Sequence, residues 1–148
     1  MKIALGADHA GFELKEYIKK MLLEKNIHVI DVGTEGETSV DYPDFALKVA
    51  LLVSSKEVNR GILVCGTGIG MSIVANKVKG IRASFVQDIY TAIQSRKHLD
   101  ANVLALGGRI TGKGLAEEIV RVWLETPFEG GRHQRRIEKI NEWEKKTQ

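Results

Sequence analysis

The stretch GILVCGTGIGMSIVANKV, residues 61–78, joins a continuous apolar run to three alternating glycines and then to a helix-like pattern. Residues 61–65 carry no polar side chain on either face, which is typical of a strand buried on both sides of a parallel sheet. From Met71 to Val78, apolar residues recur at intervals of three and four, which predicts a helix. This stretch therefore predicts a strand–loop–helix unit of an α/β protein.

The same alternation extends over the rest of the chain. Helical patterns separate and follow the strands; Pro43 suits the first turn of one helix, and Asp88 can cap another. The expected strands are residues 2–6, 28–33, 61–65, 81–85 and 102–106. Alternation of this kind predicts a three-layer, Rossmann-like α/β fold: a doubly wound sheet of five parallel strands with an extra C-terminal helix.

No linker or repeat interrupts the pattern, so we expect residues 1–148 to form one domain. The last amphipathic stretch carries Ile137, Ile140 and Trp143, and no strand follows it. A helix without a strand partner leaves its apolar side uncovered, and we expect another subunit to cover it.

Composition narrows the class of protein. The 22 Lys and Arg residues are interleaved with 19 Asp and Glu residues, so the basic stripe expected of a nucleic-acid-binding protein is missing. A single cysteine forms no internal disulfide and suits a reducing compartment. No long uncharged apolar stretch is present, and we predict a cytoplasmic protein without membrane contact. Four scattered histidines and one cysteine lack paired-ligand spacing, so no metal site is predicted.

The unusual polar residues follow the expected strands. Asp8 and His9 come directly after the first strand, Cys65 ends the third, and Arg109 follows the fifth. Tyr42 lies in the loop after the second strand. Because ligands of open parallel sheets bind beyond the carboxyl ends of the strands, these residues are candidates for one site.

The glycine loop is a candidate anion site. Gly66, Gly68 and Gly70 leave backbone N–H groups uncovered at the start of a helix, and such a nest attracts phosphate or a developing oxyanion. No Gly-Lys-Ser/Thr follows, and Met71 stands where a dinucleotide fingerprint needs its last glycine. A tight turn without a ligand is the alternative that this motif leaves open.

Cys65 precedes that loop, where uncovered amides and a helix N-terminus favour a thiolate that acts as a nucleophile or general base. Free cysteine is also among the most buried residue types, and Cys65 taken alone fits a core position better than a reactive one.

Three further candidates also have two interpretations each. Asp8 can cap the following helix, and His98 can interact with the dipole at the end of its helix. Arg132 and Arg136, four residues apart on one helical face, suit a phosphate monoester or form a solvated basic face.

Five segments spread over nearly the whole chain together resemble the type B ribose-5-phosphate isomerase family, which includes galactose-6-phosphate isomerase subunits and enzymes of allose 6-phosphate. The segments are ADHAGFELK (7–15), DYPDFA (41–46), CGTGIGMSIVANKVKGIRA (65–83), SRKHLDANVLALGGR (95–109) and FEGGRHQRR (128–136). The family interconverts aldose and ketose phosphates through an enediolate without metal or other cofactor. The resemblance therefore implies that this chain is a cofactor-free aldose–ketose isomerase.

The resemblance also implies roles for individual residues. Cys65 would move a proton between two carbons, Thr67 and the loop amides would hold the developing oxyanion, and His98 would assist ring opening. Asp8 would bind ring hydroxyls, with Tyr42 nearby. The loop amides belong to Gly66, Gly68, Ile69 and Gly70, and the residues that would hold the phosphate are His9, Arg109, Arg132 and Arg136. The family's sites are shared between two chains, which implies a homodimer or a larger assembly such as a tetramer.

Two positions set this chain apart within the family. Met71 stands where another branch, which lacks the cysteine, has glutamate, so the chain resembles the cysteine branch. Leu99 replaces the asparagine that usually follows the ring-opening histidine and contacts the sugar. The expected reaction is the interconversion of ribose 5-phosphate and ribulose 5-phosphate. The alternatives are isomerisation of a six-carbon sugar phosphate and a non-catalytic sugar-phosphate-binding module.

Overall fold

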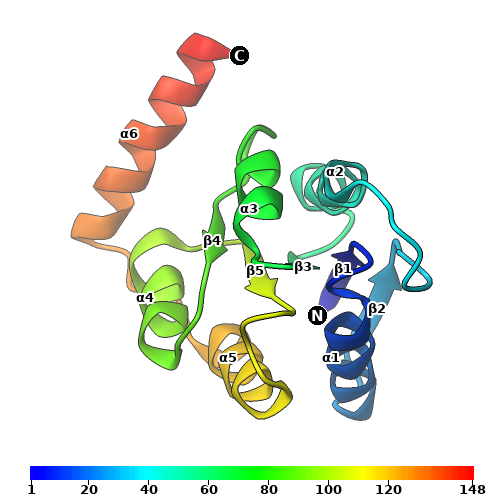
Figure 1. Cartoon of the computed structure of the whole chain (residues 1–148). Helices are drawn as coiled ribbons and strands as arrows, with labels where there is room; N and C mark the ends of the chain where they lie inside the picture. Colours follow the sequence, from blue (N-terminus) through cyan, green and yellow to red (C-terminus); the bar gives the residue numbers. More distant parts are fainter.

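The computed structural model describes residues 1–148 and contains a five-stranded sheet between layers of helices (Figure 1). The strands are β1 (Lys2–Ala7), β2 (His28–Asp31), β3 (Arg60–Cys65), β4 (Ala83–Phe85) and β5 (Val103–Gly107). They are all parallel and lie in the order β2-β1-β3-β5-β4. The predicted doubly wound α/β fold is confirmed. β4 starts later than expected because the N–H of Ile81 still bonds the Val78 carbonyl in a turn.

Helices cover both faces of this sheet. They are α1 (Phe12–Glu24), α2 (Tyr42–Ser54), α3 (Ile69–Ala75), α4 (Ile89–Leu99), α5 (Lys113–Glu125) and α6 (Arg132–Thr147). Helices α2 and α3 pack on one face, and α1, α4 and α5 pack on the other (Figure 1). Pro43 lies in the first turn of α2, and the Asp88 carboxylate accepts a hydrogen bond from the Thr91 N–H at 2.7 Å, as predicted.

Alternating side chains of the central strands fill two hydrophobic layers. In β3, Ile62 and Val64 face the α1 and α5 layer, whereas Leu63 and Cys65 face the α2 and α3 layer. Full burial of one such large side chain contributes about 1.5–3 kcal/mol. Both faces of β3 are covered from Gly61 to Cys65, and this part of the strand is buried throughout.

Helix α6 extends away from the rest of the chain on the α4 side (Figure 1). His133 and Ile137 are its only buried residues, whereas Ile140 and Trp143 are 48% and 68% exposed. The expectation that another subunit covers these apolar side chains remains a prediction. None of the helices combines the length and apolar character that crossing a membrane requires.

Candidate active site

The ends of β1, β3 and β5 are tied together by backbone hydrogen bonds. The N–H of Asp8 donates to the Val64 carbonyl at 3.2 Å, and the N–H of Gly108 donates to the Cys65 carbonyl at 2.7 Å. Gly11 makes this possible, because a Cβ there would lie 2.1 Å from the carbonyl oxygen of Val64. We call the side chains at this edge of the sheet the strand-end cluster: Asp8, His9, Tyr42, Cys65, Thr67 and Arg109. Tyr42 is the first residue of α2 and does not lie in a loop as predicted.

The loop after β3 has the geometry of an anion nest. Gly68 adopts φ +85°, and its N–H donates to Sγ of Cys65 at 3.2 Å. The N–H groups of four residues on the loop and the first turn of α3 donate to no acceptor in the chain; they belong to Gly66, Thr67, Gly70 and Met71. Unpaired amides at one turn can satisfy a bound anion or an oxyanion that forms there.

Cys65 is both a core residue and a neighbour of these donors. It is 5% exposed and packs in the layer that contains Met71 and Ala75. The larger cavities of the chain are not lined by Cys65. Access to the thiol in one isolated chain is therefore narrow. Cys65 is thus buried, as the core interpretation predicts, and it also lies beside the loop amides, as the thiolate interpretation predicts.

Asp8 and His9 are held by the backbone of their surroundings. Oδ1 of Asp8 accepts from the N–H groups of Ala10 and Gly11, both at 3.0 Å, so Asp8 shapes the turn before α1. The predicted helix cap does not form, because the N-cap residue of α1 is Gly11 and no side chain caps it. Its other oxygen, Oδ2, accepts no hydrogen bond in the chain. Nδ1 of His9 accepts from the N–H of Val40 at 3.1 Å, which leaves Nε2 as the donor nitrogen of the neutral ring.

Two glycines allow side chains from other elements to lie on the loop. A Cβ on Gly70 would lie 2.8 Å from the ring of Tyr42, and a Cβ on Gly66 would lie 3.4 Å from Nη1 of Arg109. Tyr42 and Arg109 therefore flank the nest from α2 and from the loop after β5. The structure brings these predicted residues together around Cys65.

The other predicted residues lie elsewhere in the chain. Helix α4 begins after the carboxyl end of β4 and runs back to the opposite edge of the sheet. There Nε of Arg82, just before β4, donates to the carbonyl of Leu99 at 2.7 Å. His98 thus lies near the amino edge of the sheet, and Arg132 and Arg136 are exposed in the first turns of α6, as predicted. In one chain these residues do not meet Cys65.

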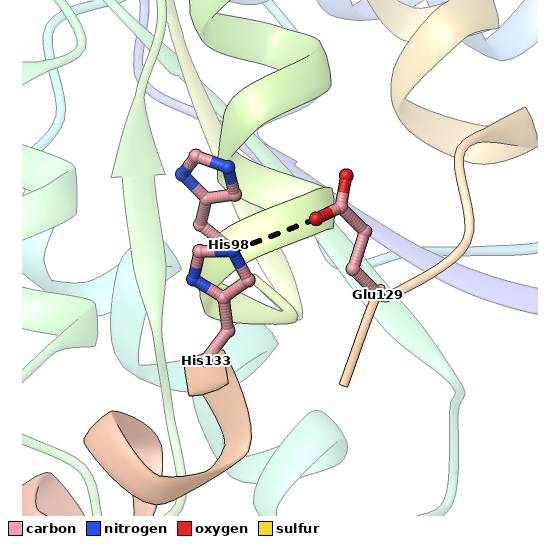
Figure 2. Close-up of side chains that lie close together, drawn as sticks. All are labelled: His98, Glu129 and His133. Atoms are coloured by element: carbon pink, nitrogen blue, oxygen red, sulfur yellow. Dashed lines mark ion pairs between the residues drawn. The ribbon is translucent and has the colours of Figure 1, made fainter. Parts of the chain in front are cut away.

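His98 has neighbours that the sequence pattern does not indicate. Its ring stacks on that of His133, with centroids 4.0 Å apart and planes at 14°. Figure 2 shows the Glu129 carboxylate beside the two rings, and its Oε2 lies 3.5 Å from Nε2 of His133. We call this group the helix-end cluster: His98, Leu99, Glu129, Arg132, His133 and Arg136.

The surroundings of His133 lower its pKa. The side chain is 4% exposed, and burial lowers its pKa, as do the nearby His98 and Arg132. The histidines described as scattered along the sequence thus include a contacting pair. The only sequence feature that could indicate this contact is the four-residue spacing of Glu129 and His133. That spacing implies contact only within a helix, and α6 starts between the two residues.

Comparison with known proteins shows strong similarity along the chain. A family model described as Ribose/Galactose Isomerase matches residues 3–140. Ribose-5-phosphate isomerase B of Escherichia coli is 52% identical over 139 residues, covering 94% of this chain and 93% of that protein. D-erythrulose-4-phosphate isomerase of Pectobacterium atrosepticum is 46% identical over 97% of this chain and 95% of that protein. The solved structure of Clostridium thermocellum ribose-5-phosphate isomerase B superposes with a TM-score of 0.99 at 55% identity, and each chain is fully covered.

Proposed function

This chain belongs to the ribose/galactose isomerase family, and we therefore propose that it interconverts ribose 5-phosphate and ribulose 5-phosphate with Cys65 as the base. Membership makes it an aldose–ketose isomerase. We choose a five-carbon sugar as the substrate because the chain is similar to proteins named ribose-5-phosphate isomerase B.

One observation carries the proposed mechanism: Sγ of Cys65 lies 3.2 Å from the amide of Gly68, within a loop that has four unpaired N–H groups. The thiolate removes a proton from the carbon beside the substrate carbonyl, and the electron pair moves onto the carbonyl oxygen. The loop amides stabilise this oxyanion. The hydroxyl proton on the adjacent carbon passes to this oxyanion, so that a new carbonyl forms there, while the thiol returns the carbon-bound proton to the former carbonyl carbon. One proton has then moved between the carbons and one between the oxygens, so aldose and ketose have the same composition.

The loop amides would also allow the reaction to proceed without a metal ion. Enediolate formation requires a positive or donating partner for the developing charge, and one preorganised donor contributes roughly 3–4 kcal/mol. Several donors of the chain itself are available beside Cys65. We therefore propose that turnover requires no divalent cation.

We further propose that two chains form a homodimer in which the helix-end cluster of one completes the strand-end cluster of the other. The two clusters lie at opposite edges of the sheet, so His98 and the arginine pair cannot assist Cys65 of the same chain. In the dimer, His98 assists ring opening, and Arg132 and Arg136 hold the phosphate that tethers the sugar. Exposed Ile140 and Trp143 provide apolar surface for such an assembly.

The decisive experiment replaces the single cysteine. Cys65→Ala should lower kcat for ribose 5-phosphate by about 1,000-fold or more, because a positioned base contributes up to about 10⁴-fold. Binding of ribose 5-phosphate by calorimetry should remain, and wild-type turnover should persist in excess chelator. Turnover that survives the substitution would refute the cysteine mechanism, and loss of wild-type turnover in chelator would refute metal independence.

A second candidate substrate is a sugar phosphate of another length. The similar Pectobacterium protein is named for a four-carbon sugar, and Leu99, where the resemblance leads us to expect asparagine, is 41% exposed beside His98. We expect kcat/KM to be highest for ribose 5-phosphate among four-, five- and six-carbon aldose phosphates. Higher kcat/KM for allose 6-phosphate would reassign the substrate, and binding of all three without turnover would support a non-catalytic module.

A further inference from the structure

The helix-end cluster brings three potential metal ligands together from two parts of the chain. The ligand atoms of His98, Glu129 and His133 all lie within 4.8 Å of one another, and Figure 2 shows the carboxylate facing the stacked rings. We propose that these three side chains bind a transition-metal dication such as Zn²⁺, and that the bound ion inhibits the enzyme. Two imidazoles and one carboxylate form a ligand set that suits Zn²⁺.

The second observation concerns His133, whose Nε2 is buried and has no hydrogen-bond partner. A buried polar nitrogen left unpaired costs free energy, which a ligand at this nitrogen would recover. The ring must be neutral to bind a metal.

Metal binding requires two movements. One imidazole must rotate out of the stack, because a bound metal lies in the plane of each ring, and planes at 14° with centroids 4.0 Å apart do not meet near the nitrogens. Zinc bonds of about 2.0–2.2 Å place tetrahedral ligand atoms roughly 3.3 Å apart. Oε2 of Glu129 and Nε2 of His133 are already only 3.5 Å apart. His98 and Glu129 must supply the remaining shift, and both have freedom to do so because Glu129 is exposed and His98 is half-exposed.

The surrounding charges limit the affinity. Arg132 and Arg136 repel a cation, and Nζ of Lys97 lies 3.8 Å from Oε1 of Glu129. We therefore expect micromolar binding, weaker than that of a structural zinc site. Mg²⁺ prefers oxygen ligands and an octahedral shell, so it should not bind here.

Inhibition follows from the role of His98, and this step rests on the proposed function. A metal bound to the imidazole occupies the lone pair that proton transfer during ring opening requires. The ion also adds positive charge beside the arginine pair and alters the phosphate site. Binding itself does not depend on turnover and is therefore measured separately.

Binding is tested by calorimetry on the full chain carrying Cys65→Ala, which removes the thiol as a competing ligand. Zn²⁺ should bind at one ion per chain, and Glu129→Gln in this background should weaken binding by about tenfold or more. Glu142→Gln is the matched control, because Glu142 is exposed on α6 and forms no ion pair or hydrogen bond in the chain. Absence of Zn²⁺ binding, or equal affinities in the two variants, would overturn the proposed site.

Inhibition is tested on the wild-type chain in phosphate-free buffer with a non-thiol reductant. Zn²⁺ should suppress turnover, chelator should restore it, and Glu129→Gln should require about tenfold more Zn²⁺ for half-inhibition, relative to its own uninhibited rate. Zn²⁺ binding without inhibition would overturn the link to His98. Bound Co²⁺ with a thiolate charge-transfer band in the wild-type chain would assign inhibition to Cys65 instead and would also overturn the proposal.

Discussion

The strand-end and helix-end clusters are built in opposite ways. Around Cys65, backbone hydrogen bonds join three strand ends, and glycines let the loops approach closely. Around His98, by contrast, the groups come from the end of one helix and the start of another that packs little on its own chain. In the proposed dimer, the sheet thus fixes the atoms that react, whereas assembly places the groups that open the ring and hold the phosphate.

The strongest effect that we expect tests whether the two clusters act across chains. Cys65→Ala and His98→Asn should each be nearly inactive alone. In a mixed dimer one of the two sites is intact, so the purified mixed dimer should recover about one half of wild-type turnover. This turnover would be more than 100-fold higher than that of a dimer in which both chains carry Cys65→Ala. Co-expression with two affinity tags and assay of the doubly purified species measures the recovery.

No recovery in that species would show that Cys65 and His98 do not meet in the dimer. The control is a double variant that carries both substitutions in each chain, and it should stay inactive.

The next largest effect tests whether the positions of the loop amides after β3 determine kcat. Gly68→Ala places a Cβ 2.9 Å from the carbonyl carbon of Leu106 and should shift the loop amides, lowering kcat by about 100-fold. Gly80→Ala is the matched control: Gly80 has φ +79° but nothing within 4 Å. Both should lose about 1–3 kcal/mol of unfolding free energy from backbone strain. Equal losses of kcat would show that strain alone, rather than the nest, governs turnover.

A smaller effect concerns the helix-end cluster. Arg136→Ala should raise KM for ribose 5-phosphate by about tenfold or more with little change in kcat, because a charged hydrogen bond contributes about 1.5–3 kcal/mol. Arg135→Ala is the control, since Arg135 is the exposed neighbouring residue and forms no ion pair in the chain. Steady-state kinetics of the two variants compares them, and similar KM values would contradict the assignment of Arg136 to the phosphate.

The weakest effect is on stability. The lowered pKa of His133 means that the unfolded chain binds more protons just below the ordinary histidine pKa of about 6.5. The stabilising contribution is therefore complete above that pH and decreases as the pH falls below it. Urea unfolding measured between pH 7.5 and 5.5 should show the free energy of unfolding decreasing as the pH falls, and we call this dependence the pH slope.

The groups that face His133 offer two variants for this measurement. His98, Arg132 and Arg136 lower its pKa, whereas Glu129 raises it. His133→Asn should flatten the pH slope, and Glu129→Gln, a surface change that spares the buried ring, should steepen it. A pH slope unchanged from wild type in both variants would contradict the assignment.

Much of the strand-end cluster was predictable from the sequence. Residues 61–65 are apolar throughout, and the glycines after Cys65 determine a turn whose amides are left unpaired, because these are properties of neighbouring residues. The pairing of His98 with His133 was not predictable. The two residues are 35 positions apart (133 minus 98), and their contact depends on how α6 leaves Gly131 and packs on α4.

Local sequence alone accounts for the order of strands and helices, the position of the thiol at a strand end and the donors that follow it, since periodicity and turn chemistry act over a few residues. Which predicted residues share a site depends instead on how the whole chain folds. The fold places Asp8, His9, Tyr42 and Arg109 around Cys65 and sends His98 to the opposite edge of the sheet, because a helix after a parallel strand must run back along it.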